Sequence, residues 1–216
     1  MTTFADFLLE HLPPAPARVL EVGCGPEGGV TPALVEAGYD VLAIDERAPE
    51  GEEFRRISLE QLEEPAAFDA VVAERVFHHV HPLGEALDKV TRVAPLLLLD
   101  EFAWDRIDEA TRDWYEGQHR ILTATGRQPS GPPDLAEWRE RWADLHPSSV
   151  LRRELAARFE QRLYEDRPYL YRWLDGPATE PLEQALIDAG AIRPIGFRWV
   201  GASAVSDREH QLEARA

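Results

Sequence analysis

A cluster of glycines near the start of the chain constrains its fold more than any other feature. The cluster follows a short apolar strand predicted over Arg18 to Val22 and comprises Gly23, Gly25, Gly28 and Gly29. Glycine adopts backbone conformations that other residues avoid, so glycines directly after a strand indicate a turn where the backbone approaches a ligand closely. Thr31 and Pro32 suit an N-cap and a first helical turn, and we predict a helix from there to Ala37.

An acidic residue ends the next predicted strand, which spans Asp40 to Asp45. Asp45 follows the glycine loop by about 20 residues, the spacing at which a carboxylate accepts both hydroxyls of a ribose. Glu21 lies just before the loop, within reach of a ligand's ammonium group. Glu27 lies inside the loop, where its charge repels a pyrophosphate. The pattern therefore favours a nucleoside ligand without phosphates over a dinucleotide.

Strands and helices alternate through the rest of the first half. The further strands that we predict are Phe54–Ser58, Phe68–Ala73 and Leu96–Leu99, and the further helices are Thr3–Leu12 and Leu83–Val93. Such alternation is typical of a parallel sheet with right-handed crossovers. We therefore predict an α/β fold with a doubly wound, Rossmann-like, mostly parallel sheet.

Helices dominate after residue 101. The predicted helices are Asp105–Thr125, Asp134–Leu145, Ser149–Leu163 and Pro177–Ala189, before a final strand over Ile192–Val200. The stretch Arg158 to Tyr164 fits equally well a strand paired with that final one. This helical block is larger than a plain crossover needs.

Composition and charge exclude several kinds of partner. The chain has 40 acidic and 23 basic residues, a formal net charge of −17. Because lysine and arginine supply most of the affinity for nucleic acids and anionic membranes, we expect neither as a partner. The longest apolar run, Val93 to Leu99, is far shorter than the ~20 residues of a membrane-spanning helix. With Cys24 as the only cysteine and no signal-peptide pattern, we expect a cytoplasmic protein.

Three motifs, in the same order along the chain, resemble those of the class I S-adenosylmethionine-dependent methyltransferases. They are Val19-Leu20-Glu21-Val22-Gly23-Cys24-Gly25 as the glycine loop, Asp45 as the ribose acid, and Phe68 to Glu74 with Phe77-His78-His79 at the fourth strand. The segments Asp100 to Asp105 and Pro168 to Arg172 are also similar to a small actinobacterial branch of the type 11/12-like enzymes. The resemblance implies the fold and S-adenosylmethionine as the cofactor.

The resemblance also implies which residues bind the cofactor. The glycines would lie against its methionine part, Glu21 at its amino group, Asp45 at the ribose and Glu46 near the adenine edge. The family often has an acidic residue near the adenine, where this chain has Ser58 and Leu59, so Ser58 or backbone groups would serve instead. The full set that we predict is Glu21, Gly23, Cys24, Gly25, Asp45, Glu46, Ser58, Leu59, Glu74 and Arg75.

The resemblance further divides the chain into regions. We expect a single domain over residues 1–216, with a cofactor-binding core at 15–101. A largely helical lid and acceptor region would follow the fifth strand at 102–176, and a helix and strand at 177–201 would complete the sheet. The expected function is O- or N-methylation of a small-molecule acceptor.

An acceptor hydroxyl or protonated amine needs a general base, and three histidines are candidates. They are His78, His79 and His119, and the sequence does not decide among them. Neighbouring histidines on a strand point to opposite faces, so we expect no metal ion. His119 lies one helical turn from Tyr115, and aromatic residues are frequent nearby, which favours an apolar or aromatic acceptor.

Two other functions are compatible with the loop. A nicotinamide-dependent oxidoreductase is disfavoured by Glu27 and by the absence of a Tyr-x-x-x-Lys pair. A non-catalytic cofactor-binding module of the same fold needs the same loop, so the sequence leaves that alternative open.

Overall fold

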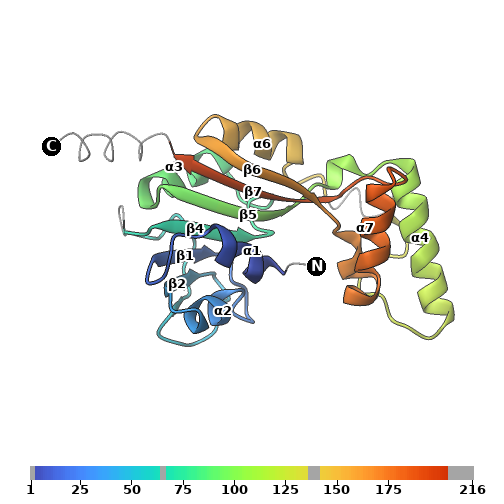
Figure 1. Cartoon of the computed structure of the whole chain (residues 1–216), viewed down its shortest axis with the longest axis horizontal. Helices are drawn as coiled ribbons and strands as arrows, with labels where there is room; N and C mark the ends of the chain where they lie inside the picture. Colours follow the sequence, from blue (N-terminus) through green and yellow to red (C-terminus); the bar gives the residue numbers. More distant parts are fainter. Residues whose placement is uncertain (1–2, 64–66, 136–141, 204–216) are drawn as a thin grey trace. The chain divides into compact units, whose positions relative to one another are not determined.

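One sheet joins the strands of this protein, which we describe from a computed structural model (Figure 1). The structure describes residues 3–63, 67–135 and 142–203. Within these residues the sheet has seven strands in the order β3-β2-β1-β4-β5-β7-β6. Their bounds are Arg18–Val22 for β1, Asp40–Ile44 for β2, Phe54–Arg55 for β3, Ala70–Glu74 for β4, Leu96–Phe102 for β5, Phe159–Arg167 for β6 and Gly196–Ser203 for β7. The predicted doubly wound, mostly parallel α/β fold is confirmed.

The order of the strands places a binding edge beside β1. The pairs β1–β2, β1–β4, β2–β3 and β4–β5 are parallel, so their carboxyl ends meet at one edge of the sheet. The chain leaves β1 toward β2 on one side and returns at β4 on the other, which makes β1 and β4 the topological switch point. β7 runs antiparallel to β5, because Ser203 N–H donates to Pro95 O at one end and Ala103 N–H donates to Ile195 O at the other.

Contacts divide the described residues into two compact units. Residues 3–101, 151–164 and 198–203 belong to one, which we call the core unit. Residues 102–150 and 165–197 belong to the other, which we call the helical unit. This grouping places the predicted helix at 177–189 with the insertion after the fifth strand.

The central strands of the core unit are almost completely buried. β1, β2 and β4 each have four buried residues in succession, and all of β5 is buried. Its helices are α1 (Phe4–His11), α2 (Thr31–Glu36), α3 (Leu83–Val93) and α6 (Ser148–Ala156), the last of which begins in the helical unit. A capping box begins α1: Asp6 N–H donates to Thr3 Oγ1, and Thr3 N–H donates to the Asp6 carboxylate. Apolar side chains of α1 and α2 then pack with those of the strands into one core.

The helical unit is held by aromatic side chains. Its helices are α4 (Glu109–Ala124) and α7 (Glu180–Asp188), with short 3₁₀ helices at Trp104–Arg106, Leu170–Trp173 and Gly176–Ala178. Phe102 stacks on Tyr169 with ring centroids 4.4 Å apart, and Trp142 stacks on Trp173 at 6.1 Å. Among the described residues of the chain, no helix is long and apolar enough to cross a membrane.

The structure corrects several predicted bounds. The helix predicted over Ser149–Leu163 ends at Ala156, and β6 follows it, so the alternative strand at Arg158–Tyr164 is the correct one. The helix predicted over Asp105–Thr125 begins later, after a 3₁₀ turn, where Asp108 accepts Thr111 N–H at 2.9 Å. Half of the helix predicted over Asp134–Leu145 lies outside the described residues.

Shorter elements also differ from the prediction. β3 ends at Arg55 rather than Ser58, and β7 begins at Gly196 rather than Ile192. Val30, not Thr31, is the N-cap of α2. Thr31 is instead the first residue of the helix, and its hydroxyl donates to Glu21 at 2.6 Å.

Candidate functional site

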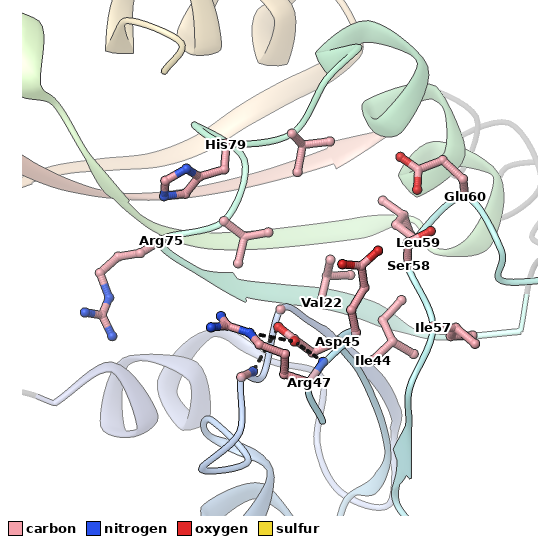
Figure 2. Close-up of a pocket in the computed structure, with 15 residues that line it drawn as sticks. Val22, Ile44, Asp45, Arg47, Ile57, Ser58, Leu59, Glu60, Arg75 and His79 are labelled. Atoms are coloured by element: carbon pink, nitrogen blue, oxygen red, sulfur yellow. Dashed lines mark hydrogen bonds and ion pairs between the residues drawn. The ribbon is translucent and has the colours of Figure 1, made fainter. Parts of the chain in front are cut away.

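A cavity of about 510 Å³ opens at the carboxyl ends of β1, β2 and β4 (Figure 2). All of the residues that line it belong to the core unit. They include seven of the predicted cofactor-binding residues, which are Gly23, Gly25, Asp45, Glu46, Ser58, Leu59 and Arg75. Glu21, Cys24 and Glu74 are not among the lining residues. Of the three candidate histidines, His79 lines the cavity.

The glycine loop allows the backbone to form the wall of the cavity. Gly23 and Gly25 have φ of +78° and +63°, a region that favours glycine. A Cβ on Gly23 would clash with the side chain of Val76, which lines the cavity beside it. A Cβ on Gly25 would meet only Glu27 Oε2, at 3.9 Å, so the space beside Gly25 is open. The loop therefore offers bare backbone to a ligand, as the sequence predicts.

Glu21 supports this loop from behind. Its side chain is 2% exposed and accepts Val30 N–H at 2.9 Å and the Thr31 hydroxyl at 2.6 Å. A Cβ on Gly29 would collide with the Glu21 carboxylate. Burial raises the pKa of Glu21, against the effect of these hydrogen bonds. Glu21 thus fixes the loop and the start of α2, and its contact with an ammonium group stays a prediction.

Asp45 joins the glycine loop to the turn after β2. Its Oδ2 accepts Gly25 N–H at 3.1 Å, and its Oδ1 accepts Arg47 N–H at 2.7 Å. A carboxylate has about four lone-pair sites, so Asp45 can still accept two hydroxyls from a ligand. Glu46 is exposed and lines the cavity next to it.

Apolar side chains line the cavity beyond Asp45. Ile44, Ile57, Leu59 and Val80 all contribute to this wall. The Ser58 N–H donates to Gln61 Oε1 at 2.9 Å. Aliphatic walls beside paired carboxylates suit a flat base joined to a ribose.

The turn after β4 closes the other side of the cavity. Arg75 has φ of +60°, and its N–H donates to Asp100 O at 2.7 Å. Its guanidinium lies 3.4 Å from the Glu74 carboxylate. Figure 2 shows Arg75 and His79 on one side of the cavity, with Ser58 and Leu59 on the other.

Glu101 organises this turn, and our sequence analysis did not assign it to the site. Its side chain is fully buried, and Oε1 accepts Val76 N–H at 3.1 Å and Phe77 N–H at 2.7 Å. Its Oε2 lies 2.6 Å from His78 Nδ1. A charged residue inside the apolar run of β5 was the available signal, because a buried charge requires hydrogen-bond partners.

The two neighbouring histidines therefore have different surroundings. His78 is 3% exposed, contacts Glu101 and does not line the cavity, so its role as a catalytic candidate stays a prediction. His79 keeps contact with solvent, and its ring centroid lies 4.2 Å from that of His78. Partial burial of its ring, and then the neighbouring His78, lower the pKa of His79. The neutral imidazole, which can accept a proton, is thus favoured at neutral pH.

The remaining predicted residues are not among those that line the cavity. Cys24 is buried, and burial raises the pKa of its thiol to about 12, so the thiol stays protonated. His119 lies on α4 in the helical unit, with Nε2 3.2 Å from Gly131 O. Asp100 forms a buried ion pair with Arg198 at 3.1 Å. Over residues 3–63, 67–135 and 142–203, no group of three or more metal-ligating side chains could hold a metal ion.

Comparison with known proteins identifies the fold. Residues 2–164 match the model of a family described as a methyltransferase domain. An S-adenosylmethionine-dependent methyltransferase from Mesorhizobium loti has a similar structure, with a TM-score of 0.56, 17% identity, and coverage of 91% of this chain and 95% of that chain. The structure of 1,6-didemethyltoxoflavin-N1-methyltransferase from Burkholderia thailandensis, with 1,6-didemethyltoxoflavin and S-adenosylhomocysteine bound, has a TM-score of 0.57 at 19% identity and covers 92% of this chain and 76% of that chain. No curated protein matches the sequence.

Proposed function

The chain belongs to the methyltransferase domain family, and from this premise we propose that it transfers a methyl group from S-adenosylmethionine to a small-molecule acceptor, by O- or N-methylation. The cavity at the switch point of the sheet carries the proposal. It combines bare glycine backbone, the carboxylates of Asp45 and Glu46, and an aliphatic wall. Its acidic side chains also suit a cofactor with a positively charged sulfur.

The residues present fit this cofactor. Asp45 and Glu46 would hold the ribose, and Leu59 with its aliphatic neighbours would hold the adenine. The backbone at Gly23 and Gly25 would lie along the methionine part. When bound, the cofactor supplies a methyl group on a sulfonium, activated for in-line displacement.

His79 would serve as the general base. It lines the cavity, and its lowered pKa keeps the imidazole neutral at the pH of the cell. A neutral imidazole accepts the proton of an acceptor hydroxyl as its oxygen attacks the methyl group. For an ammonium group it accepts the proton first, which frees the nitrogen lone pair for the attack. Glu101 and His78 would act through position alone, because they hold the turn that carries His79. The lid and acceptor region expected at 102–176 stays a prediction.

Calorimetric titration tests the cofactor. S-adenosylmethionine and S-adenosylhomocysteine should bind with micromolar affinity, and NADH and NADPH should not bind. Asp45→Ala should lower the affinity for both sulfur compounds by roughly 10- to 100-fold, as expected for the loss of hydrogen bonds to a charged group. Unchanged affinity in that variant would count against the site.

The ionisation of His79 gives a second test that needs no acceptor. In a proton NMR titration, the pKa of the His79 ring should lie below 6.5, the ordinary pKa of histidine. Once an acceptor is found by labelled-methyl transfer, His79→Gln should lower kcat by about 10²- to 10⁴-fold. A ring that titrates at or above 6.5, or a variant with normal kcat, would remove His79 from the reaction. Binding without turnover on any extract would instead indicate a non-catalytic module.

A further inference from the structure

Arg75 adopts an unusual backbone conformation at the edge of the cavity. Among the described residues, it is the only one other than glycine with positive φ, at +60°. For a residue with a Cβ, this region is strained, because the Cβ lies too close to the carbonyl oxygen. Glycine or asparagine would make the same turn at lower cost. The strain therefore points to a use for the guanidinium.

The positive charge of Arg75 does not suit the sulfonium of the proposed cofactor. A guanidinium beside a sulfonium repels it, and Glu74 at 3.4 Å is the neighbouring carboxylate that offsets this charge. Both side chains keep solvent contact, with 42% and 19% exposure. A pair this accessible contributes little to stability, so an incoming anion can take the place of Glu74.

The position of Arg75 indicates where that anion would bind. The other cavity-lining arginine, Arg47, lies beside the ribose acid, with Nε 3.9 Å from Asp45 Oδ1. Arg75 instead shares its side of the cavity with His79, away from Ser58 and Leu59 (Figure 2). Arg75 thus lies on the side of the cavity that carries the proposed base rather than at the adenine end.

We propose that Arg75 binds an anionic group of the methyl acceptor, and that the acceptor is a molecule carrying a carboxylate or phosphate. This inference rests on the proposed function. The planar guanidinium matches both anions with two parallel hydrogen bonds, which orients the molecule as well as holding it. An acceptor fixed in this way presents its hydroxyl or amine to His79.

Binding of simple probes to the chain saturated with S-adenosylhomocysteine tests the proposal. The probes are benzoate, phenyl phosphate and uncharged benzamide, measured by calorimetry. We expect at least one of the anions to bind about tenfold more tightly than benzamide, and Arg75→Asn to lose this preference. Arg75→Lys should retain part of this preference, because lysine keeps the charge but cannot form the two parallel hydrogen bonds of a guanidinium. Arg92→Asn is the matched control, because it removes an exposed arginine of α3 outside the cavity and should change nothing.

A thermal melt separates loss of binding from loss of fold. Asparagine relieves the strain at position 75, so Arg75→Asn should melt about 2 °C or more above the wild-type chain. A variant that is more stable but no longer prefers the anions would show that Arg75 acts through its guanidinium, at a cost in stability. A variant with a lower melting temperature would contradict the strain argument, and Arg75→Lys would then decide the charge dependence.

Three outcomes would overturn the proposal. One is an equal affinity for benzoate, phenyl phosphate and benzamide, or no binding of either anion. The second is an anion preference that persists in Arg75→Asn. The third is a loss of about tenfold or more in S-adenosylhomocysteine affinity in that variant with unchanged binding of 5′-methylthioadenosine, which would place Arg75 on the cofactor's own carboxylate. Failure of the wild-type chain to bind S-adenosylhomocysteine would instead reject the proposed function.

Discussion

The core unit and the helical unit achieve order by different means. The core unit exposes backbone at its cavity, through glycines with positive φ and short polar side chains. The helical unit has an interior of stacked rings such as Phe102, Tyr169 and Trp173. The cavity therefore depends on backbone conformations that glycine favours, whereas the interior of the helical unit depends on the packing of large rings.

The two units nevertheless share one device, a fully buried glutamate that collects backbone N–H groups. Glu101 accepts two from the turn after β4. Glu183 on α7 accepts three, from Tyr169 at 2.8 Å, Leu170 at 3.0 Å and Tyr171 at 2.6 Å. In both places the segment is irregular, so its N–H groups have no helix or strand partner, and the carboxylate accepts their hydrogen bonds instead. The difference is the third partner, a histidine ring for Glu101 and another backbone N–H for Glu183.

The largest expected effect is a loss of stability with rising pH that comes from the helical unit. Burial raises the pKa of Glu183 from 4.5 to about 7. The folded chain therefore holds this proton more tightly than the unfolded chain, so the contribution is complete below pH 4.5 and is lost as the pH rises through 7. It amounts to up to about 3 kcal/mol of unfolding free energy. Urea unfolding of wild type and Glu183→Gln at pH 5 and pH 8 measures it.

The core unit supplies the control for this measurement. Burial also raises the pKa of Glu21, so part of the pH dependence comes from that side chain. Glu183→Gln should remove its own part and leave the part that Glu21→Gln removes. If wild type and Glu183→Gln lose the same free energy between the two pH values, Glu183 is not the titrating group.

A smaller effect distinguishes the two buried glutamates, measured for Glu183 at pH 5, where its carboxyl is protonated, and for Glu101 at pH 8, where a histidine is ordinarily neutral. A glutamine at 183 can accept the N–H groups of Tyr169 and Leu170, but its amide nitrogen then faces Tyr171 N–H. Two donors facing each other in a buried site should cost about 2 kcal/mol. A glutamine at 101 faces His78 Nδ1, which can become an acceptor by a change of tautomer, so the loss should be about 1 kcal/mol or less. Equal losses in the two variants, measured by urea unfolding, would mean that the histidine offers no such adjustment.

The same contrast explains what the sequence could predict. β1 at Arg18–Val22 and α3 at Leu83–Val93 have their predicted bounds, because each depends on local patterns of apolar residues and breakers. Gly23, Gly25 and Asp45 do meet at one cavity, since parallel strands bring their carboxyl ends together. Their contact with a cofactor stays a prediction.

Longer-range features escaped the sequence analysis. The helical pattern after Ser149 runs on into β6, and only pairing with the distant β7 decides that the residues from Phe159 form a strand. Nothing local separates His78 from His79 either. Their difference arises because Glu101, on the neighbouring strand, lies 2.6 Å from His78 Nδ1, whereas His79 lines the cavity. Partners brought together by the fold, not by spacing, carry this information.

The smallest expected effect comes from two tyrosines that fasten loops in the same way. In the helical unit, the Tyr115 hydroxyl donates to Pro132 O at 2.9 Å, and both residues are buried. In the core unit, the Tyr39 hydroxyl donates to Pro13 O at 3.0 Å, and both residues are half-buried. Removing the first hydroxyl leaves a carbonyl without water, whereas removing the second leaves one that water can reach. Tyr115→Phe should therefore lower the unfolding free energy by about 1–2 kcal/mol and Tyr39→Phe by about 0.5 kcal/mol. Each variant is the control for the other in urea unfolding, because the chemical change is identical. Equal losses of unfolding free energy in the two variants would show that the different solvent access of the two carbonyl groups has no effect on stability.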